Sequence, residues 1–115
     1  MTVWNVASIA DRPAVELIRW RIMRTNSGGM HFVGCETVDH NGRVSSAIAD
    51  FDAAARRGAT RSGRIYLLSG PSGFHPAATY VWTRWCEFNK VTAYDDVSSD
   101  VMPGRNRIGA AVELQ

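Results

Sequence analysis

The sequence predicts a single α+β domain in which a small antiparallel sheet packs against one main amphipathic helix. We expect the sheet to consist of an N-terminal hairpin and one or two further strands. Two periodic segments carry this prediction, a period-two stretch before residue 25 and a helical stretch after residue 76. The length of 115 residues and the 45% hydrophobic content are those of one globular domain. Within 1–115 we expect residues 1–13 and 102–115 to be less ordered than the rest.

The hairpin is predicted by alternation on both sides of a glycine-containing turn. Apolar and polar residues alternate over 17–24, which is typical of a strand with one buried face. The cluster Asn26-Ser27-Gly28-Gly29 predicts a turn, and 30–37 predicts the second strand. A four-residue loop places Thr25 opposite Met30. The register that follows pairs Ile22 with Val33, Trp20 with Cys35, Ile18 with Thr37 and, on the exposed face, Arg19 with Glu36.

The middle of the chain leaves one alternative open. The stretch 43–57 fits helical spacing with a cap at Gly58, but it also fits an edge strand to about residue 50 followed by one or two helical turns. The apolar run 64–68 predicts a central strand, Pro76 opens a helix over 77–90, and 91–97 predicts a last strand. We expect Trp20 and Trp85 to be buried. The apolar stripe of the helix consists of Ala78, Val81, Trp82, Trp85 and Phe88.

Arginine dominates the positive charge and concentrates in one segment. Twelve of the thirteen basic residues are Arg, although the net charge is only +2. The segment 53–86 has five arginines and no acidic residue, which indicates a docking surface for an acidic partner. The alternative for each arginine is a solvated side chain without a partner. The residues predicted to contact a partner are Arg56, Arg57, Arg61 and Arg64, with Arg19 and Arg21 as a second patch.

No motif for catalysis, metal binding or nucleotide binding is complete. The turn Ser69-Gly70-Pro71-Ser72-Gly73 matches neither a nucleophile elbow nor a P-loop. The histidines lack metal-ligand spacing, and the acidic cluster of Asp95, Asp96 and Asp100 lacks a glycine turn. We therefore expect no catalytic residue, no metal and no cofactor. An enzyme or toxin with a site near Ser72, His75 and Asp95 remains a third hypothesis.

Other features predict a protein of the cytoplasm. No apolar stretch is long enough to span a membrane, and residues 1–11 lack the pattern of a secretory signal. Cys35 and Cys86 have no zinc or redox spacing, so we interpret them as reduced packing residues. The helical spacing of Trp82 and Trp85 favours a place in the core over a stacking platform for bases. Nothing in the sequence indicates an oligomeric state.

A resemblance adds to this reading. It rests on His31-Phe32-Val33-Gly34, Gly42-Arg43-Val44-Ser45-Ser46, Thr60-Arg61-Ser62-Gly63-Arg64-Ile65-Tyr66, and Tyr80-Val81-Trp82 with Trp85. These segments resemble small uncharacterised proteins of proteobacterial prophages and other mobile elements, a group that includes anti-CRISPR inhibitors. The resemblance implies a non-catalytic protein that inhibits a host defence nucleoprotein complex by covering an acidic surface of it. The runner-up function is a nucleic-acid-binding accessory protein that uses the same arginines on phosphates.

Overall fold

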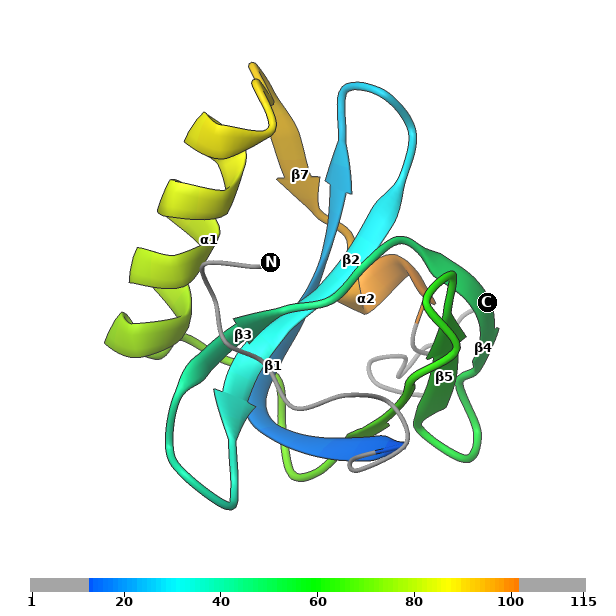
Figure 1. Cartoon of the computed structure of the whole chain (residues 1–115). Helices are drawn as coiled ribbons and strands as arrows, with labels where there is room; N and C mark the ends of the chain where they lie inside the picture. The colour runs from blue at the N-terminus through cyan, green and yellow to red at the C-terminus, as the bar shows by residue number, and fades with distance from the viewer. Residues whose placement is uncertain (1–12, 102–115) are drawn as a thin grey trace.

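The computed structural model describes residues 13–101, which form one seven-stranded mixed sheet and two short helices (Figure 1). In chain order the elements are β1 (Ala14–Thr25), β2 (Met30–Glu36), β3 (Gly42–Val44), β4 (Ile48–Asp52), β5 (Arg57–Thr60), β6 (Ile65–Leu68), α1 (Pro76–Phe88), β7 (Tyr94–Asp96) and α2 (Ser98–Val101). The long strand β1 pairs with β2 along one edge and with both β6 and β7 along the other. The sheet is therefore organised around β1.

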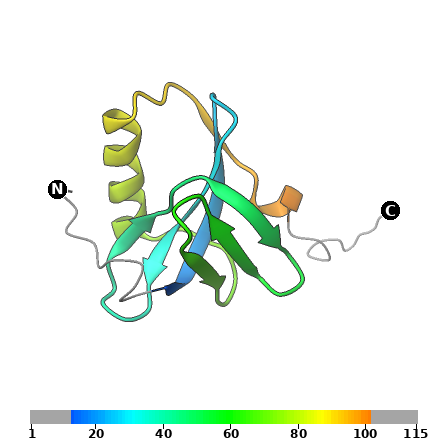
Figure 2. The ribbon, with the colours of Figure 1, turned by 45° about the vertical axis from the view of Figure 1, so that its right-hand side comes forward.

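The sheet closes on itself into a barrel. Its strand order is β3-β2-β1-β6-β5-β4, and only residues 45–47 separate β3 from β4 in the chain. Ser45 N donates to Phe32 O (2.9 Å) in β2, and Arg61 N, just after β5, donates to Ala47 O (2.8 Å). β3 and β4 therefore act as one bent strand (Figure 2). From β1 to β6 the successive strand passes alternate in direction, with β3 and β4 taken as one pass, so β1 and β6 run the same way and pair in parallel.

The predicted fold class is wrong. Residues 13–101 form a mixed sheet of seven strands, whereas α1 has 13 residues and α2 has four. The larger core lies inside the barrel, where the sheet packs against itself, rather than between a small antiparallel sheet and a helix. The stretch 43–57 accounts for much of the difference, because it forms β3, β4, a turn over 53–56 and the start of β5, with no helical turn. This stretch pairs with β2 and β5. Contacts between segments distant in sequence determine that pairing, so the local periodicity of the stretch does not predict it.

Several predicted elements are confirmed. β6 is a central strand between β1 and β5, α1 begins at Pro76, and β7 follows α1. His75 caps the helix, since its Nδ1 accepts a hydrogen bond from Ala77 N (3.1 Å). The tails that we expect to be less ordered lie, apart from Pro13, outside the described residues.

The hairpin of β1 and β2 is confirmed, but its predicted register is wrong. Arg24, not Thr25, faces Met30. A bulge farther along places Arg19 and Trp20 opposite the single residue Gly34, which displaces the pairs beyond it again. The structure pairs Ile22 with Phe32, Arg21 with Val33, Ile18 with Cys35 and Leu17 with Glu36. Arg19 and Glu36 are consequently not directly opposite each other.

The bulge keeps one face of β1 apolar from Val15 to Ile22. Arg19 adopts a φ of 48°, a left-handed conformation that costs a non-glycine residue about 1–2 kcal/mol. The extra residue shifts the alternation by one, so the interior-facing residues are Val15 and Leu17 before the bulge and Trp20 and Ile22 after it. A Cβ atom on Gly34 would lie 3.1 Å from Trp20 Cα. A glycine opposite the bulge thus allows the close approach that the bend requires.

Two apolar cores lie on opposite faces of β1 and β2. The barrel core consists of Val15, Leu17, Trp20, Ile22, Phe32, Tyr66, Leu68 and Val97. The second core lies between the sheet and α1 and consists of Met23, Val33, Ala78, Trp82 and Cys86. The helix comes so close to β3 that a Cβ atom on Gly42 would lie 2.5 Å from the carbonyl carbon of Ala77. Gly42 is therefore where α1 docks on the barrel.

α1 presents a slightly different face to the sheet than its sequence predicts. Ala78, Trp82 and Cys86, spaced four apart, are its buried residues. Phe88, which we expected in the apolar stripe, is 74% exposed, and Trp85 is only half-buried. The burial of Trp20 is confirmed. The helix is therefore rotated toward Cys86 and away from Phe88.

Candidate binding surface

Arg56 lies in the turn between β4 and β5 and is engaged within the fold. Its guanidinium carbon lies 5.6 Å from the centroid of the Trp20 ring, a cation–π distance. Its Nη2 donates to the Gly70 carbonyl (2.6 Å), which also accepts a hydrogen bond from Trp20 Nε1 (3.0 Å). Arg56 thus ties this turn to the loop after β6, and it is not a free surface arginine.

Arg64 is buried rather than exposed. It lies just before β6 and only 6% of it is accessible to solvent. Its carbonyl accepts a hydrogen bond from Thr60 N (3.1 Å) across the turn between β5 and β6. A buried guanidinium must be compensated inside the fold, because its desolvation is costly. Arg56 and Arg64 are therefore not part of one exposed patch with the two other predicted arginines of this segment.

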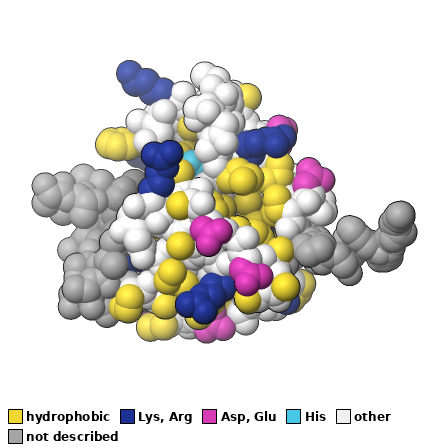
Figure 3. All heavy atoms as spheres, turned by 90° about the vertical axis from the view of Figure 1, so that its right-hand side faces the viewer, with side chains coloured by type: hydrophobic (Ala, Val, Ile, Leu, Met, Phe, Trp, Pro, Cys, Tyr) yellow, Lys and Arg dark blue, Asp and Glu magenta, His cyan; other side chains and the backbone are white. Residues whose placement is uncertain are grey.

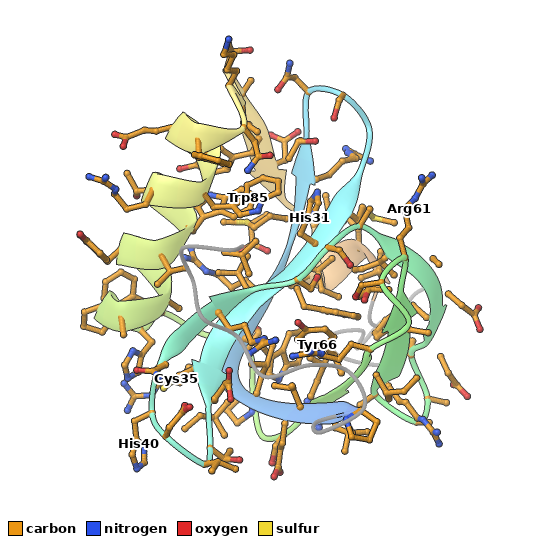
Figure 4. All side chains as sticks on the ribbon, in the orientation of Figure 1. His31, Cys35, His40, Arg61, Tyr66 and Trp85 are labelled. Carbon is orange, nitrogen blue, oxygen red and sulfur yellow. The ribbon has the colours of Figure 1, made fainter. Side chains whose placement is uncertain are left out.

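Arg57 and Arg61 are exposed on one side of β5. Gly58 and Thr60 are buried between them, as the alternation of a strand requires. In the part of the chain that the structure describes, neither guanidinium makes a hydrogen bond or an ion pair. Figure 4 shows Arg61 extending away from the ribbon. Of the four arginines predicted to bind a partner in this segment, these two are the ones that the structure leaves exposed.

β4 supplies the carboxylates that the segment 53–86 lacks. Asp52 faces Arg57 across the β4–β5 pair, and Asp50 faces Ala59. Both aspartates are exposed, and so is Leu67 on β6, which faces Arg57 from the other side. Figure 3 shows acidic and basic side chains interspersed on this side of the molecule. We call the surface formed by Asp50, Asp52, Arg57, Arg61 and Leu67 the β5 face.

The predicted second patch lies elsewhere. Arg19 is exposed at the bulge of β1, and Arg21 Nη2 donates to Thr79 Oγ1 of α1 (3.3 Å). α1 and β5 lie on opposite sides of the barrel (Figure 1). The structure therefore does not bring Arg19 and Arg21 together with Arg57 and Arg61, and the role of these four residues in binding stays a prediction.

Ser72, His75 and Asp95 do not form a catalytic arrangement. The loop 69–75 runs along β1, where Ser69 N donates to Leu17 O (2.8 Å) and Gly73 N donates to Trp20 O (3.2 Å). His75 caps the first turn of α1, whereas Asp95 lies beyond the other end of that helix. The loop is a structural connection along β1 rather than a phosphate-binding turn.

The aspartates of the predicted acidic cluster contact different groups and do not form one site. Asp95 lies 3.9 Å from Arg24, and Asp96 accepts hydrogen bonds from the backbone and hydroxyl of Ser98 (3.0 and 2.6 Å). Neither contacts the arginines of the β5 face. Residues 13–101 contain no group of three His, Cys, Asp or Glu side chains that could hold a metal ion.

His31 and Cys35 lie on the face of β2 toward α1. His31 Nδ1 donates to the Ser45 carbonyl (2.9 Å), and the His31 ring centroid lies 4.5 Å from that of Trp85 (Figure 4). Burial lowers the pKa of His31, and hydrogen bonds to the backbone offset this only in part. Burial likewise raises the pKa of the Cys35 and Cys86 thiols. The imidazole is therefore neutral near pH 7 and neither thiol is activated as a nucleophile.

A buried polar network joins β2, β3 and β6. Arg43 Nη1 lies 2.6 Å from Glu36 Oε2, and Arg43 Nε donates to the Tyr66 hydroxyl (3.0 Å). Burial acts to lower the pKa of Arg43, but the interactions with Tyr66 and Glu36 outweigh it and raise that pKa. The network secures β3 against β2 and β6, and every one of its members is engaged within the barrel.

The outer face of α1 carries two exposed aromatic residues, of which sequence reasoning placed Tyr80 outside the apolar stripe and missed Phe88. Tyr80 is 66% exposed and Phe88 74% exposed, and Arg84 lies midway between them at four-residue spacing. Arg84 Nε lies 3.8 Å from Glu87 Oε1, and both side chains are largely exposed. The spacing of Cys86 from Ala78 and Trp82 is the signal that would have placed Phe88 outside the core. We call the surface formed by Tyr80, Arg84, Glu87 and Phe88 the α1 face.

Comparisons with protein-family models, with curated proteins and with solved structures found no match. None of the helices in residues 13–101 has the length and apolar character needed to cross a membrane. Residues 13–101 form a small β-barrel with the 13-residue helix α1 packed on its outside. Two exposed surfaces, the β5 face and the α1 face, lie on opposite sides of that barrel.

Proposed function

We propose that this protein is a cytoplasmic, non-catalytic binding protein that attaches to an acidic surface of a partner protein through the β5 face. The observation that carries the proposal is the exposure of Arg57 and Arg61 on one side of β5, with no hydrogen bond or ion pair within residues 13–101. Arg57 lies in β5, and Arg61 directly follows that strand with its backbone N–H donating to Ala47 O, so little ordering of the chain is needed when the two side chains bind carboxylates.

The charges around these arginines favour a protein partner over a nucleic acid. Asp50 and Asp52 lie on the neighbouring strand, and phosphates at close spacing would be repelled by them. A protein surface can place an acidic group opposite each arginine and a polar group opposite each aspartate. The resemblance to prophage proteins extends the proposal to a host defence nucleoprotein complex as the partner, inhibited because a protein surface of it is covered.

The test is the double charge reversal Arg57→Glu with Arg61→Glu. Thermal stability should fall only slightly, because both side chains are exposed and make no hydrogen bond or ion pair in the described residues, and a carboxylate at position 57 opposite the exposed Asp52 costs less than about 1 kcal/mol. Capture of the partner from a host lysate, quantified by mass spectrometry, should fall by about tenfold or more. The matched control is Arg24→Glu with Lys90→Glu, which changes the net charge equally on another side of the molecule and should leave capture intact.

Two outcomes would count against the proposal. Equal capture by the wild type and by the folded double variant would remove the β5 face as the binding surface. Retention of labelled DNA or RNA, with an affinity that falls steeply with salt and a slope that flattens in the double variant, would favour the nucleic-acid-binding alternative.

A further inference from the structure

The α1 face has the composition of a protein interface. Aromatic residues and Arg are enriched at the centres of such interfaces, and Tyr80, Phe88 and Arg84 are all exposed here. In Figures 1 and 2 no other element of residues 13–101 lies on the outer side of α1. The aromatic side chains on this face are therefore available to a partner.

The charges of the α1 face match the same face on another copy. Arg84 and Glu87 carry opposite charges one helical turn apart, so this face has no net charge. A strongly acidic or strongly basic partner would repel one of the two residues. A second copy, turned by a two-fold axis, offers a glutamate to the arginine and an arginine to the glutamate.

Helix geometry supports this pairing. When two α1 helices lie antiparallel with the axis between positions 84 and 87, Arg84 of each copy meets Glu87 of the other. Phe88 then lies near the axis and Tyr80 lies farther out on each side. Within one helix the distance from Arg84 Nε to Glu87 Oε1 is 3.8 Å, long for a charge-assisted hydrogen bond, so little is lost when each side chain turns to the other copy.

We infer that two copies of this chain associate through the α1 face as an antiparallel, two-fold symmetric dimer. Four aromatic side chains and two pairs of charges bury roughly 1,000 Å² in such a contact, which is the low end for specific interfaces. The dimer should therefore dissociate on dilution. The β5 face lies on the other side of the barrel, so both copies of it remain exposed in the dimer.

Sedimentation equilibrium of the full chain, over a concentration series reaching the millimolar range, tests the inference. The wild type should show a reversible monomer–dimer equilibrium. Arg84→Glu alone or Glu87→Arg alone should weaken association by about fivefold or more, because two-fold symmetry turns each reversal into two repulsive contacts. The combined variant Arg84→Glu with Glu87→Arg should restore it. Phe88→Ala should weaken it by about tenfold or more.

Three results would overturn the inference. The first is a wild type that stays monomeric over the whole series. The second is a dimer that all of these variants leave unchanged, which would place the contact on another face. The third is a combined variant that fails to recover the association lost in the single reversals, which contradicts the antiparallel pairing. Arg57→Glu with Arg61→Glu should leave the dimer unchanged, so the tests of the two faces give separate answers.

Discussion

Replacing Gly42 by alanine tests how closely α1 is docked on the barrel. A Cβ atom at this position would lie 2.5 Å from the carbonyl carbon of Ala77 and 2.8 Å from Ala78 N. Ordinary contacts between carbon atoms begin near about 3.5 Å, so the helix would have to move outward by about 1 Å. All of the clashing atoms belong to the backbone, which has no rotamer to change. The displacement would separate Trp82 from Val33 and loosen the second core.

The size of the effect follows from this geometry. Overpacked interiors typically lose about 1–3 kcal/mol, and we expect Gly42→Ala to lose about 3 kcal/mol because no side chain can yield. In a domain of this size the melting temperature should fall by about 15 °C. The matched control is Gly73→Ala, since a Cβ there meets nothing within 4 Å and Gly73 has no positive φ. We expect the control to change stability by less than about 0.5 kcal/mol.

Thermal and urea denaturation, followed by tryptophan fluorescence, measure both variants against the wild type. The urea midpoint multiplied by the m-value gives the free energy of unfolding, and the thermal midpoint gives the melting temperature. Equal midpoints for Gly42→Ala and Gly73→Ala would refute the reasoning, because they would show that α1 does not approach the backbone of β3 this closely.

The remaining predictions concern buried titratable groups. Burial lowers the pKa of His31 from its ordinary 6.5. Between the folded-state pKa and pH 6.5, His31 is therefore protonated in the unfolded chain and neutral in the folded chain. The contribution of His31 to the free energy of unfolding should therefore be complete above pH 6.5, decline as the pH falls toward the folded-state pKa and then level off. His31→Phe should remove this decline. Identical pH profiles for the wild type and the variant would contradict the prediction. Burial raises the pKa of Cys35 and Cys86, so both should react with a disulfide reagent only as fast as the protein opens, and rapid labelling of either in the native protein would contradict their burial.

The sequence was sufficient where local signals decide the structure. β6 is delimited by glycines on both sides, and α1 is opened by Pro76, so their positions could be predicted. The register of the hairpin depends on the bulge at Arg19. That bulge arises where Trp20 enters the barrel core and Gly34 on the facing strand leaves room for it. Alternation within one strand contains no information about such a contact.

The charges around the candidate site could not be predicted for the same reason, since a count along the chain does not show which charged side chains are neighbours in space. A count along the chain makes 53–86 look purely basic, yet Asp52 on the preceding strand lies directly opposite Arg57. Arg64 is buried at the start of β6, although a charged residue is ordinarily expected on the surface. The exposure of Phe88 depends on a rotation of α1 by less than one residue position. Only the packing against the sheet fixes that rotation.

The parallel pairing of β1 with β6 has a consequence for the order in which the chain folds. The β1–β2 and β4–β5 hairpins join strands that are neighbours in sequence, so each can form early and locally. Closing the barrel requires Ala14 to meet Ile65, and the entropy of bringing such distant residues together is lost before any contact between them stabilises the pair. During synthesis the two hairpins can therefore exist with their apolar faces open to water until the last residues of β6 leave the ribosome. Pairing of β1 with β6 is the step that closes the barrel.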